Sequence, residues 1–379
     1  MRCSLRFVII IFFLVIGSPM TVYAVDSTTS LDDFDFTDIQ QVIDDTLSGS
    51  ELQFKDLVNM LMSGKTEEFQ KNLVVYIKDA IFLEVDANKG AIIQVMIIAA
   101  IGAIFSNFTS VFKNNQISEV GFYITYLLLI TLLAGSFGMA VSIASDMLEK
   151  LIAFMKALVP AYFLAVAFVS GSAASLAYYE FALILITAVE WLLAHLLIPL
   201  IQIYVIIMFV NNISKEDFLS KLAELIQTGA EWGLKTILGF VIGVQLIQSI
   251  ILPFISGSGT VAVQKAIQAI PGIGGSASAI SDLLLGSGVL IKNGIGAAAL
   301  VVIALISVVP MLKLAIIVFL YHFSAAALQP LADSRTVECV SSVALGGKLL
   351  LKTIFIAALL FFITIAVICS STNVTFFAS

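Results

Sequence analysis

Apolar runs long enough to cross a lipid bilayer recur along this chain of 379 residues, and they restrict its fold more than any other feature. A transmembrane helix needs about 20 predominantly apolar residues. Charged residues make up 12% of the chain, about half of the roughly 25% found in soluble domains. The sequence therefore predicts an all-α polytopic integral membrane protein. Its clearest spans are predicted at Ala91–Phe112, Val120–Ala144, Leu234–Ile255, Ala297–Leu320 and Leu349–Cys369.

The number of crossings depends on one further apolar run, Leu158–Val210, which could hold two long spans or three short ones. Two crossings give seven spans in total, but then most lysines and arginines lie outside the cytoplasm, against the positive-inside tendency. Three crossings give eight spans and restore that tendency, although about 20 residues per span makes the run tight. We favour the charge argument, and the prediction is about 7–8 transmembrane helices.

Three stretches between the spans are predicted to lie outside the hydrocarbon. Asp146–Lys156 and Asn211–Lys235 have one apolar and one charged face, so we expect two helices that lie flat at the membrane interface. Tyr321–Lys348 contains His322 and several charged residues and is predicted to be a polar loop.

Glycines concentrate over residues 256–299, between two of the predicted spans. Because glycine tolerates positive φ and lets backbones approach closely, we predict short broken helices that form a re-entrant or pore-lining region. Irregular backbone at membrane depth needs cover from protein or water. The alternative is a flexible interfacial loop with two amphipathic turns. The candidate pore or helix-packing residues of this Gly-rich hub are Gly257, Gly259, Gly272, Gly274, Gly275, Gly286, Gly288, Gly294 and Gly296.

The N-terminal residues have the pattern of an exported segment. Residues 1–24 have the features of a signal peptide, because Arg2 and Arg6 precede a short apolar core that ends near a possible cleavage site at Ala24. An uncleaved anchor is the alternative. Residues 25–89 contain fourteen acidic residues and five lysines. They are predicted to form an acidic extracytoplasmic segment of three short amphipathic helices, followed by the polytopic membrane domain at residues 90–379.

Four ionisable residues fall within apolar runs and are candidate intramembrane polar groups: Glu180, Glu190, His195 and Lys313. Such groups are costly in the bilayer and normally face the interior of a helix bundle. Glu190 and His195 are five residues apart, so they do not stack well on one helix face. Interhelical hydrogen bonding is the simpler interpretation, and a transport role is the alternative.

No pattern for catalysis or cofactor binding is found in the sequence. It lacks the G-x-x-x-x-G-K-[ST] phosphate loop, so the chain is not predicted to hydrolyse nucleotide itself. The two histidines have no carboxylate pair placed for a metal, and the three cysteines fit neither a disulfide framework nor a zinc site. The acidic N-terminal segment argues against a nucleic-acid partner. We expect no enzyme activity and no cofactor.

Several stretches of the chain resemble one known family. The Gly-rich run GSGTVAVQKAIQAIPGIGGSASAISDLLLGSGVLIKNGIG begins at Gly257, and HFSAAALQPLADSR begins at His322. Supporting stretches are SNFTSVF at Ser106–Phe112, with QISE just beyond, and VPAYF at Val159–Phe163. Together they resemble the stage III sporulation protein AE family over roughly residues 90–370.

The resemblance implies a role in endospore formation. It implies that the chain belongs to a complex in the mother-cell membrane around the forespore. The implied partners are other stage III sporulation A-operon membrane proteins, a separate ATPase subunit and a forespore membrane protein. That complex would form a channel or secretion-like conduit, needed for late forespore gene expression under sigma factor G. No catalytic residue is implied.

Two hypotheses for function therefore stand side by side. The first is a membrane platform or channel component of the sporulation complex. The second is a self-sufficient secondary transporter that uses intramembrane carboxylates such as Glu180 and Glu190. Transporters often show internal repeats with broken helices in matching halves. The chain has no half-to-half symmetry, which favours the platform.

Overall fold

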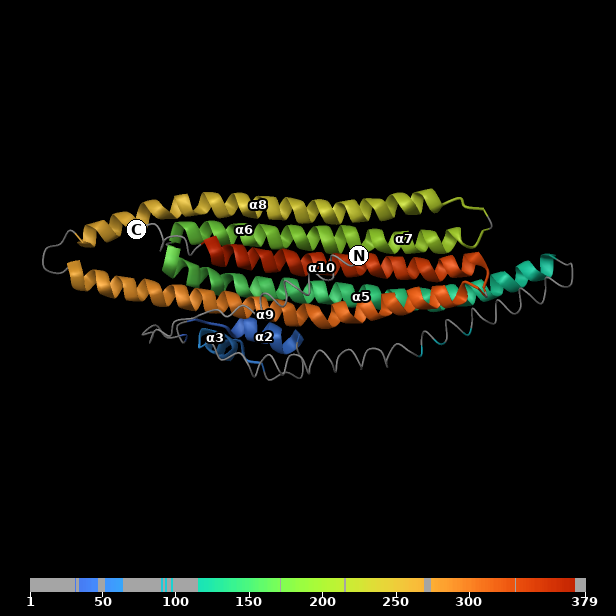
Figure 1. Ribbon diagram of the computed structural model, residues 1–379, viewed down its shortest axis with the longest axis horizontal. Helices are drawn as coiled ribbons and strands as arrows, with labels where there is room; N and C mark the ends of the chain where they lie inside the picture. Colours follow the sequence, from blue (N-terminus) through green and yellow to red (C-terminus); the bar gives the residue numbers. More distant parts are fainter. Residues whose placement is uncertain are drawn as a thin grey trace.

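The computed structural model describes Leu31 and residues 34–46, 52–63, 90, 93, 97, 115–170, 172–214, 216–268, 274–330 and 332–371. Every regular element among these residues is helical (Figure 1), in agreement with the all-α prediction. The predicted signal peptide and most of the first predicted span, Ala91–Phe112, lie outside them. In chain order the elements are α2 (Thr37–Thr46), α3 (Phe54–Met62), α5 (Asn115–Ser170), α6 (Ser172–Glu190), the π-helix η2 (Trp191–Leu197), α7 (Ile198–Asn211), α8 (Ser220–Gln268), α9 (Gly274–Leu328) and α10 (Ser334–Ser371).

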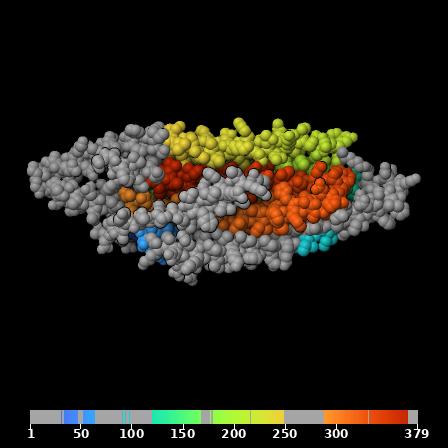
Figure 2. All heavy atoms as spheres, in the orientation of Figure 1, coloured from blue at the N-terminus to red at the C-terminus, as the bar shows by residue number. Residues whose placement is uncertain are grey.

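Five long helical rods lie side by side in this part of the chain (Figure 1). The segments α6, η2 and α7 follow one another without a gap and form one rod, and α5, α8, α9 and α10 are the others. Successive rods are joined within a few residues, so their directions alternate. The last rod, α10, contacts α5, α7, α8 and α9 and so lies at the centre of the bundle. In the space-filling view α8 forms one edge of the bundle, and α9 and α10 lie across the middle of the same face (Figure 2).

Five helices in the described part of the chain are long and apolar enough to cross a membrane, and the predicted count of seven or eight is not confirmed. The prediction of three crossings within Leu158–Val210 is wrong. That run contains the end of α5 and then the single rod α6–η2–α7. With 56 residues, α5 is about 84 Å long at 1.5 Å per residue, far longer than a hydrocarbon core of roughly 30 Å.

The predicted interfacial helix Asp146–Lys156 is instead an uninterrupted part of α5. Its charges are accommodated on the helix surface by ion pairs. Lys150 pairs with Asp146 one turn away at 2.9 Å, and Lys156 pairs with Glu190 of α6 at 2.8 Å. Charged side chains on a helix surface are compatible with a continuous helix, and α5 runs through this stretch without a break. Likewise, the predicted interfacial helix Asn211–Lys235 is a short connection followed by the start of α8.

A proline explains the π-helical segment in the middle of the second rod. Pro199 lies at the start of α7, and its ring nitrogen cannot donate to the carbonyl of residue 195 four positions earlier. The helix widens into η2 just before this point, as π-turns commonly do where the regular ladder is interrupted. The rod therefore stays continuous through His195 and Pro199, where a break between two short spans was possible.

The Gly-rich hub is also more regular than predicted. Gly257 and Gly259 lie within α8, whereas Gly274, Gly275, Gly286, Gly288, Gly294 and Gly296 lie within α9. Gly272 lies outside the described residues. Both helices are continuous through this region, so the expectation of short broken helices is wrong there. Backbone in or near a bilayer gains from complete internal hydrogen bonding, which favours an unbroken helix even where glycine is frequent.

The predicted polar loop Tyr321–Lys348 is mostly helical. Here α9 continues to Leu328 and α10 already begins at Ser334. The hydroxyl groups of Ser324 and Ser342 donate to the carbonyl oxygens four residues earlier, at 2.9 and 2.6 Å. Polar residues of this kind are thus compatible with a buried helix.

The first described residues form a small helical module, Leu31–Ser63, called the N-terminal module below. Its side chains at Ile39, Ile43, Phe54, Leu57 and Val58 are buried, as the predicted helical spacing required. The Gln40 amide joins the two helices, because it donates to the Leu52 carbonyl at 3.0 Å and accepts from the Phe54 amide at 2.8 Å. The module packs on the bundle, with α2 against α5 and α3 against α9.

Candidate functional site

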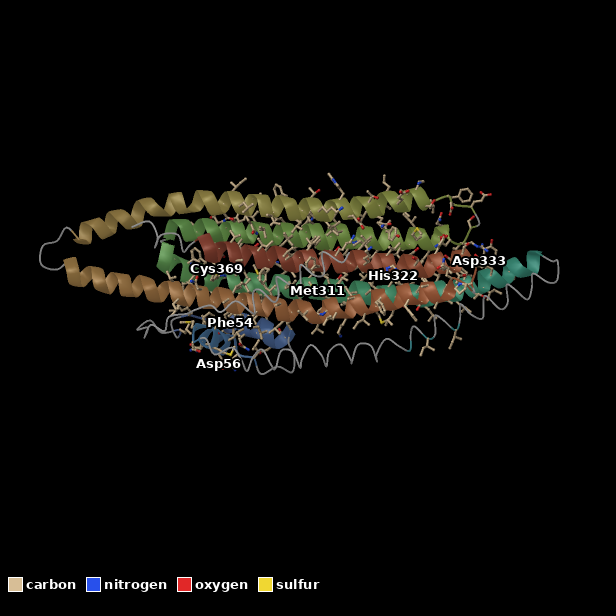
Figure 3. The ribbon with its side chains drawn as sticks, in the orientation of Figure 1. Phe54, Asp56, Met311, His322, Asp333 and Cys369 are labelled. Atoms are coloured by element: carbon tan, nitrogen blue, oxygen red, sulfur yellow. The ribbon has the colours of Figure 1, made fainter. Side chains whose placement is uncertain are left out.

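Close packing within the Gly-rich hub is found where α9 passes the end of α10. Three residues of α9, Lys292, Gly294 and Gly296, meet three other elements within little more than one helical turn. We call these residues, with their partners Met62, Tyr162 and Cys369, the α9 junction. Figure 3 shows Phe54 of the module and Cys369 of α10 near the same end of the bundle, and Asp333 near the opposite end.

Gly294 is the position on α9 at which the N-terminal module docks, and we call this contact the seat of the module. A Cβ atom at this position would lie 2.7 Å from Met62 Cγ and 3.3 Å from Val58 Cγ1 of α3. The shorter distance is below normal van der Waals contact. The absence of a side chain therefore allows α3 to approach α9 closely, which is the packing use of glycine in membrane helices.

Gly296 has the same role on the opposite contact of α9. A Cβ atom there would overlap the Cys369 thiol and would lie 3.1 Å from the Tyr162 hydroxyl. The Tyr162 hydroxyl and Cys369 Sγ are themselves within hydrogen-bond distance at 2.7 Å. Gly296 thus lets α9, α5 and the end of α10 meet at one point. For these two glycines the helix-packing interpretation is the one that the geometry supports.

Lys292 is completely buried, which is rare for a lysine. Its Nζ donates to the main-chain carbonyl oxygen of Cys369 at 3.2 Å. The last carbonyls of a helix have no intrahelical partners and carry partial negative charge. The Lys292 ammonium therefore stabilises the C-terminal end of α10 and fixes it against α9.

Of the four polar candidates, Glu180, Glu190 and His195 lie on the second rod and Lys313 lies on α9. Glu190 pairs with Lys156 of α5, which agrees with an interhelical role. Glu180 and His195 are exposed on the surface of the second rod, and Lys313 is half-buried on α9. Glu190 is paired with Lys156 and not with His195, which gives no support to an ion-coupling pair of Glu190 and His195.

Several packing residues were missed by the sequence analysis. Glu231 of α8 and Lys352 of α10 form an ion pair at 2.6 Å, and Gln245 donates to the Thr364 hydroxyl at 2.5 Å between the same helices. Gly346 lies against Val205 and Phe137, so a side chain there would overlap both. The adjacent pair Gly346-Gly347 within an apolar stretch was the available signal.

The described residues contain no group of three or more His, Cys, Asp or Glu side chains that could hold a metal ion. At the α9 junction the contacts are close packing, the hydrogen bond from Lys292 to main chain and the side-chain contact between Tyr162 and Cys369. Such an arrangement holds helices in register, and the bundle around α10 therefore has the character of a scaffold.

Comparison with known proteins identifies relatives for nearly the whole chain. The family model described as Stage III sporulation protein AE matches residues 52–372, from the start of the module's second helix to the end of α10. The protein of that name from Bacillus subtilis (strain 168) is 26% identical over 342 residues, covering 89% of this chain and 84% of that protein. No solved structure matches.

Proposed function

The chain belongs to the stage III sporulation protein AE family, and from this premise we propose that it is a membrane platform or channel component of the complex connecting mother cell and forespore. In this role it lies in the mother-cell membrane that surrounds the forespore. It acts together with the other membrane proteins of the stage III sporulation A operon and with a forespore membrane protein. A separate ATPase subunit supplies the energy, and the complex supports forespore gene expression under sigma factor G.

The observation that best supports a platform is the close packing of the rods around α10. Contact of one helix with four neighbours, and glycines at 294, 296, 346 and 347 that lie against side chains of other helices, suit a rigid scaffold. A self-sufficient secondary transporter would need its ionisable groups to converge on a shared site. Glu190 is instead paired with Lys156 at the surface of the bundle.

Affinity purification tests the proposal directly. An affinity-tagged full-length chain is purified from sporulating cells after mild cross-linking, and an unrelated tagged multi-pass protein at equal abundance serves as the control. Co-purification of the other A-operon membrane proteins, an ATPase subunit and a forespore membrane protein is expected only with the chain. Recovery of the chain alone, at normal abundance, would contradict a platform.

A reporter gene transcribed under sigma factor G tests whether the chain supports gene expression in the forespore. Deletion of the gene for this chain is expected to reduce reporter activity severely, and expression of the wild-type chain in the mother cell alone is expected to restore it. If only expression of the chain in the forespore restored reporter activity, the chain would act in the forespore, which would contradict the proposal.

A further inference from the structure

The contact between α3 and Gly294 determines how the chain is arranged across the membrane. We infer that the N-terminal module, the tip of the α8–α9 hairpin and the end of α10 lie together on the exported side. The connections between α7 and α8 and between α9 and α10 then lie in the cytoplasm. The inference follows from three steps: the seat of the module, the alternation of the rods and the distribution of charge.

The seat of the module is at one end of α10. Val58 and Met62 of α3 contact Gly294, and Lys292, two residues away on α9, bonds to the Cys369 carbonyl near the last residue of α10. The module and the C-terminal end of α10 therefore lie at the same end of the bundle (Figures 1 and 3). A soluble segment cannot contact both ends of a membrane bundle, so they share one side of the membrane.

The opposite end is defined by contacts of its own. The Tyr126 hydroxyl of α5 donates to the Phe209 carbonyl of α7 at 2.9 Å. The Arg335 guanidinium, at the start of α10, lies over the Phe122 ring at 3.5 Å and donates to the Ile213 carbonyl at 3.4 Å. The start of α5, the end of α7 and the start of α10 thus meet away from the module. α5 and α10 contribute residues to both sets of contacts and so run from one end of the bundle to the other. The short connections between successive rods make α6–η2–α7, α8 and α9 alternate with them.

Charge then selects the side of each end. The α7–α8 and α9–α10 connections, at the end away from the module, carry Lys215 and are followed within two residues by Lys221 and Arg335. The sequences of the α5–α6 and α8–α9 connections contain no charge, and the nearest lysine is Lys265, four residues before the second of them. Lysine and arginine are enriched in cytoplasmic loops. The end away from the module is therefore cytoplasmic. The exported N-terminal segment predicted from the leader gives the same result independently.

The arrangement also specifies which of the described helices extend beyond α10 on the exported side. α9 continues for 18 residues from Lys292 back to Gly274, about 27 Å at 1.5 Å per residue. With the facing part of α8 it forms a helical hairpin that projects past the end of α10 (Figure 1). In the complex proposed above, and only on that premise, this hairpin is directed towards the forespore membrane.

Cysteine labelling of the full-length chain tests the two sides. Ser258→Cys lies in the projecting part of α8 and Ser214→Cys in the connection after α7. The buried native Cys339 and half-buried Cys369 stay in place, and their background is measured in the unsubstituted chain. A membrane-impermeant maleimide applied to intact cells is expected to label the 258 variant, and the 214 variant only after the cells are opened. The reverse pattern would overturn the inference.

A disulfide between α3 and α9 tests the seat of the module. In the double variant Met62→Cys and Gly294→Cys, the sulfur at 62 takes the place of Met62 Cγ, 2.7 Å from a Cβ at 294. This is close to disulfide geometry. Oxidation is expected to join the two helices, so that a protease site inserted after Ser63 no longer releases the N-terminal fragment. Met62→Cys with Gly239→Cys is the matched control, because a Cβ at position 239 has no atom within 4 Å. This pair is expected to form no disulfide bond. If neither double variant forms a disulfide bond although both proteins are present at normal abundance, the module does not dock at Gly294.

The end of α10 supplies an independent measurement. Alkaline phosphatase, which is active only outside the cytoplasm, is fused after Ser379 of the full-length chain, and a fluorescent protein that matures only in the cytoplasm is fused at the same place. Phosphatase activity without fluorescence is expected. Fluorescence without phosphatase activity would place α10's end in the cytoplasm and contradict the arrangement, even if the purification supports the platform.

Discussion

The Lys292 ammonium donates to the Cys369 carbonyl oxygen at 3.2 Å, although the two residues are 77 positions apart in the chain. A fully buried lysine thus caps the C-terminal end of α10, the central helix of the bundle. Hydrogen bonds that involve a charged group contribute about 1.5–3 kcal/mol. This contact, with the two glycines beside it, holds α9 against α3, α5 and α10.

Removal of the Lys292 side chain is expected to weaken the bundle. Lys292→Ala leaves the Cys369 carbonyl without this donor, so the free energy of unfolding should fall by about 2 kcal/mol. Thermal unfolding in detergent, followed by the loss of the monodisperse peak in size-exclusion chromatography, measures this. Lys221→Ala is the matched control because its side chain is 92% exposed, and it should change little. Equal stability of both variants would contradict the role of Lys292.

Gly294→Ala is expected to disturb the seat of the module. The added methyl group meets Met62 Cγ at 2.7 Å, and overpacking of this kind costs about 1–3 kcal/mol. Faster proteolytic release of the module from the bundle is the expected result. A second change, Met62→Ala, removes the obstructing atoms and should restore protection. Gly239→Ala, with nothing within 4 Å, should be neutral or stabilising by up to about 1 kcal/mol, because alanine favours helix.

Gly346→Ala is expected to separate α10 from two neighbours at once. A methyl group there would overlap Val205 of α7 and would lie 2.9 Å from the Phe137 ring of α5. We expect a loss of about 1–3 kcal/mol, seen as a lower unfolding temperature. Gly243→Ala on α8 is the control, since its surroundings are open. Similar behaviour of the two variants would argue against close packing at Gly346.

The ion pair between Glu231 and Lys352 is expected to couple α8 to α10. Both side chains are about one-third exposed, so we expect a coupling energy of only about 1 kcal/mol in a double-mutant cycle with Glu231→Gln and Lys352→Met. The exposed pair Lys221–Glu224 provides the comparison and should give less. Additive effects at Glu231 and Lys352 would show that the pair contributes nothing to stability.

Glu190→Gln and Glu180→Gln are expected to leave sporulation largely intact. Glutamine at 190 can still hydrogen-bond to Lys156, and Glu180 is exposed. Spore counts at normal protein abundance measure the effect. A complete block by either change would favour the secondary transporter, because that mechanism requires a carboxylate that titrates.

The class of the protein and part of its local structure can be predicted from the order of its residues. Apolar run length predicts membrane helices wherever a chain can hydrogen-bond only to itself. The helical spacing of Ile39 and Ile43, and then of Leu57 and Val58, predicted the buried faces of α2 and α3. The Gly-rich run and the stretch from His322 predicted the family. Each of these properties depends on neighbouring residues alone.

The ends of the helices and the contacts between distant residues depend on the three-dimensional packing. The charges of Asp146–Lys156 suggested a separate interfacial helix, yet this stretch is part of α5, and Lys156 pairs with Glu190 on another helix. The glycines suggested broken helices, yet Gly294 and Gly296 are places where α3, α5 and α10 approach α9. Whether a charge or a glycine ends a helix depends on its partners in space. Those partners lie far away along the chain, so no local pattern contains them.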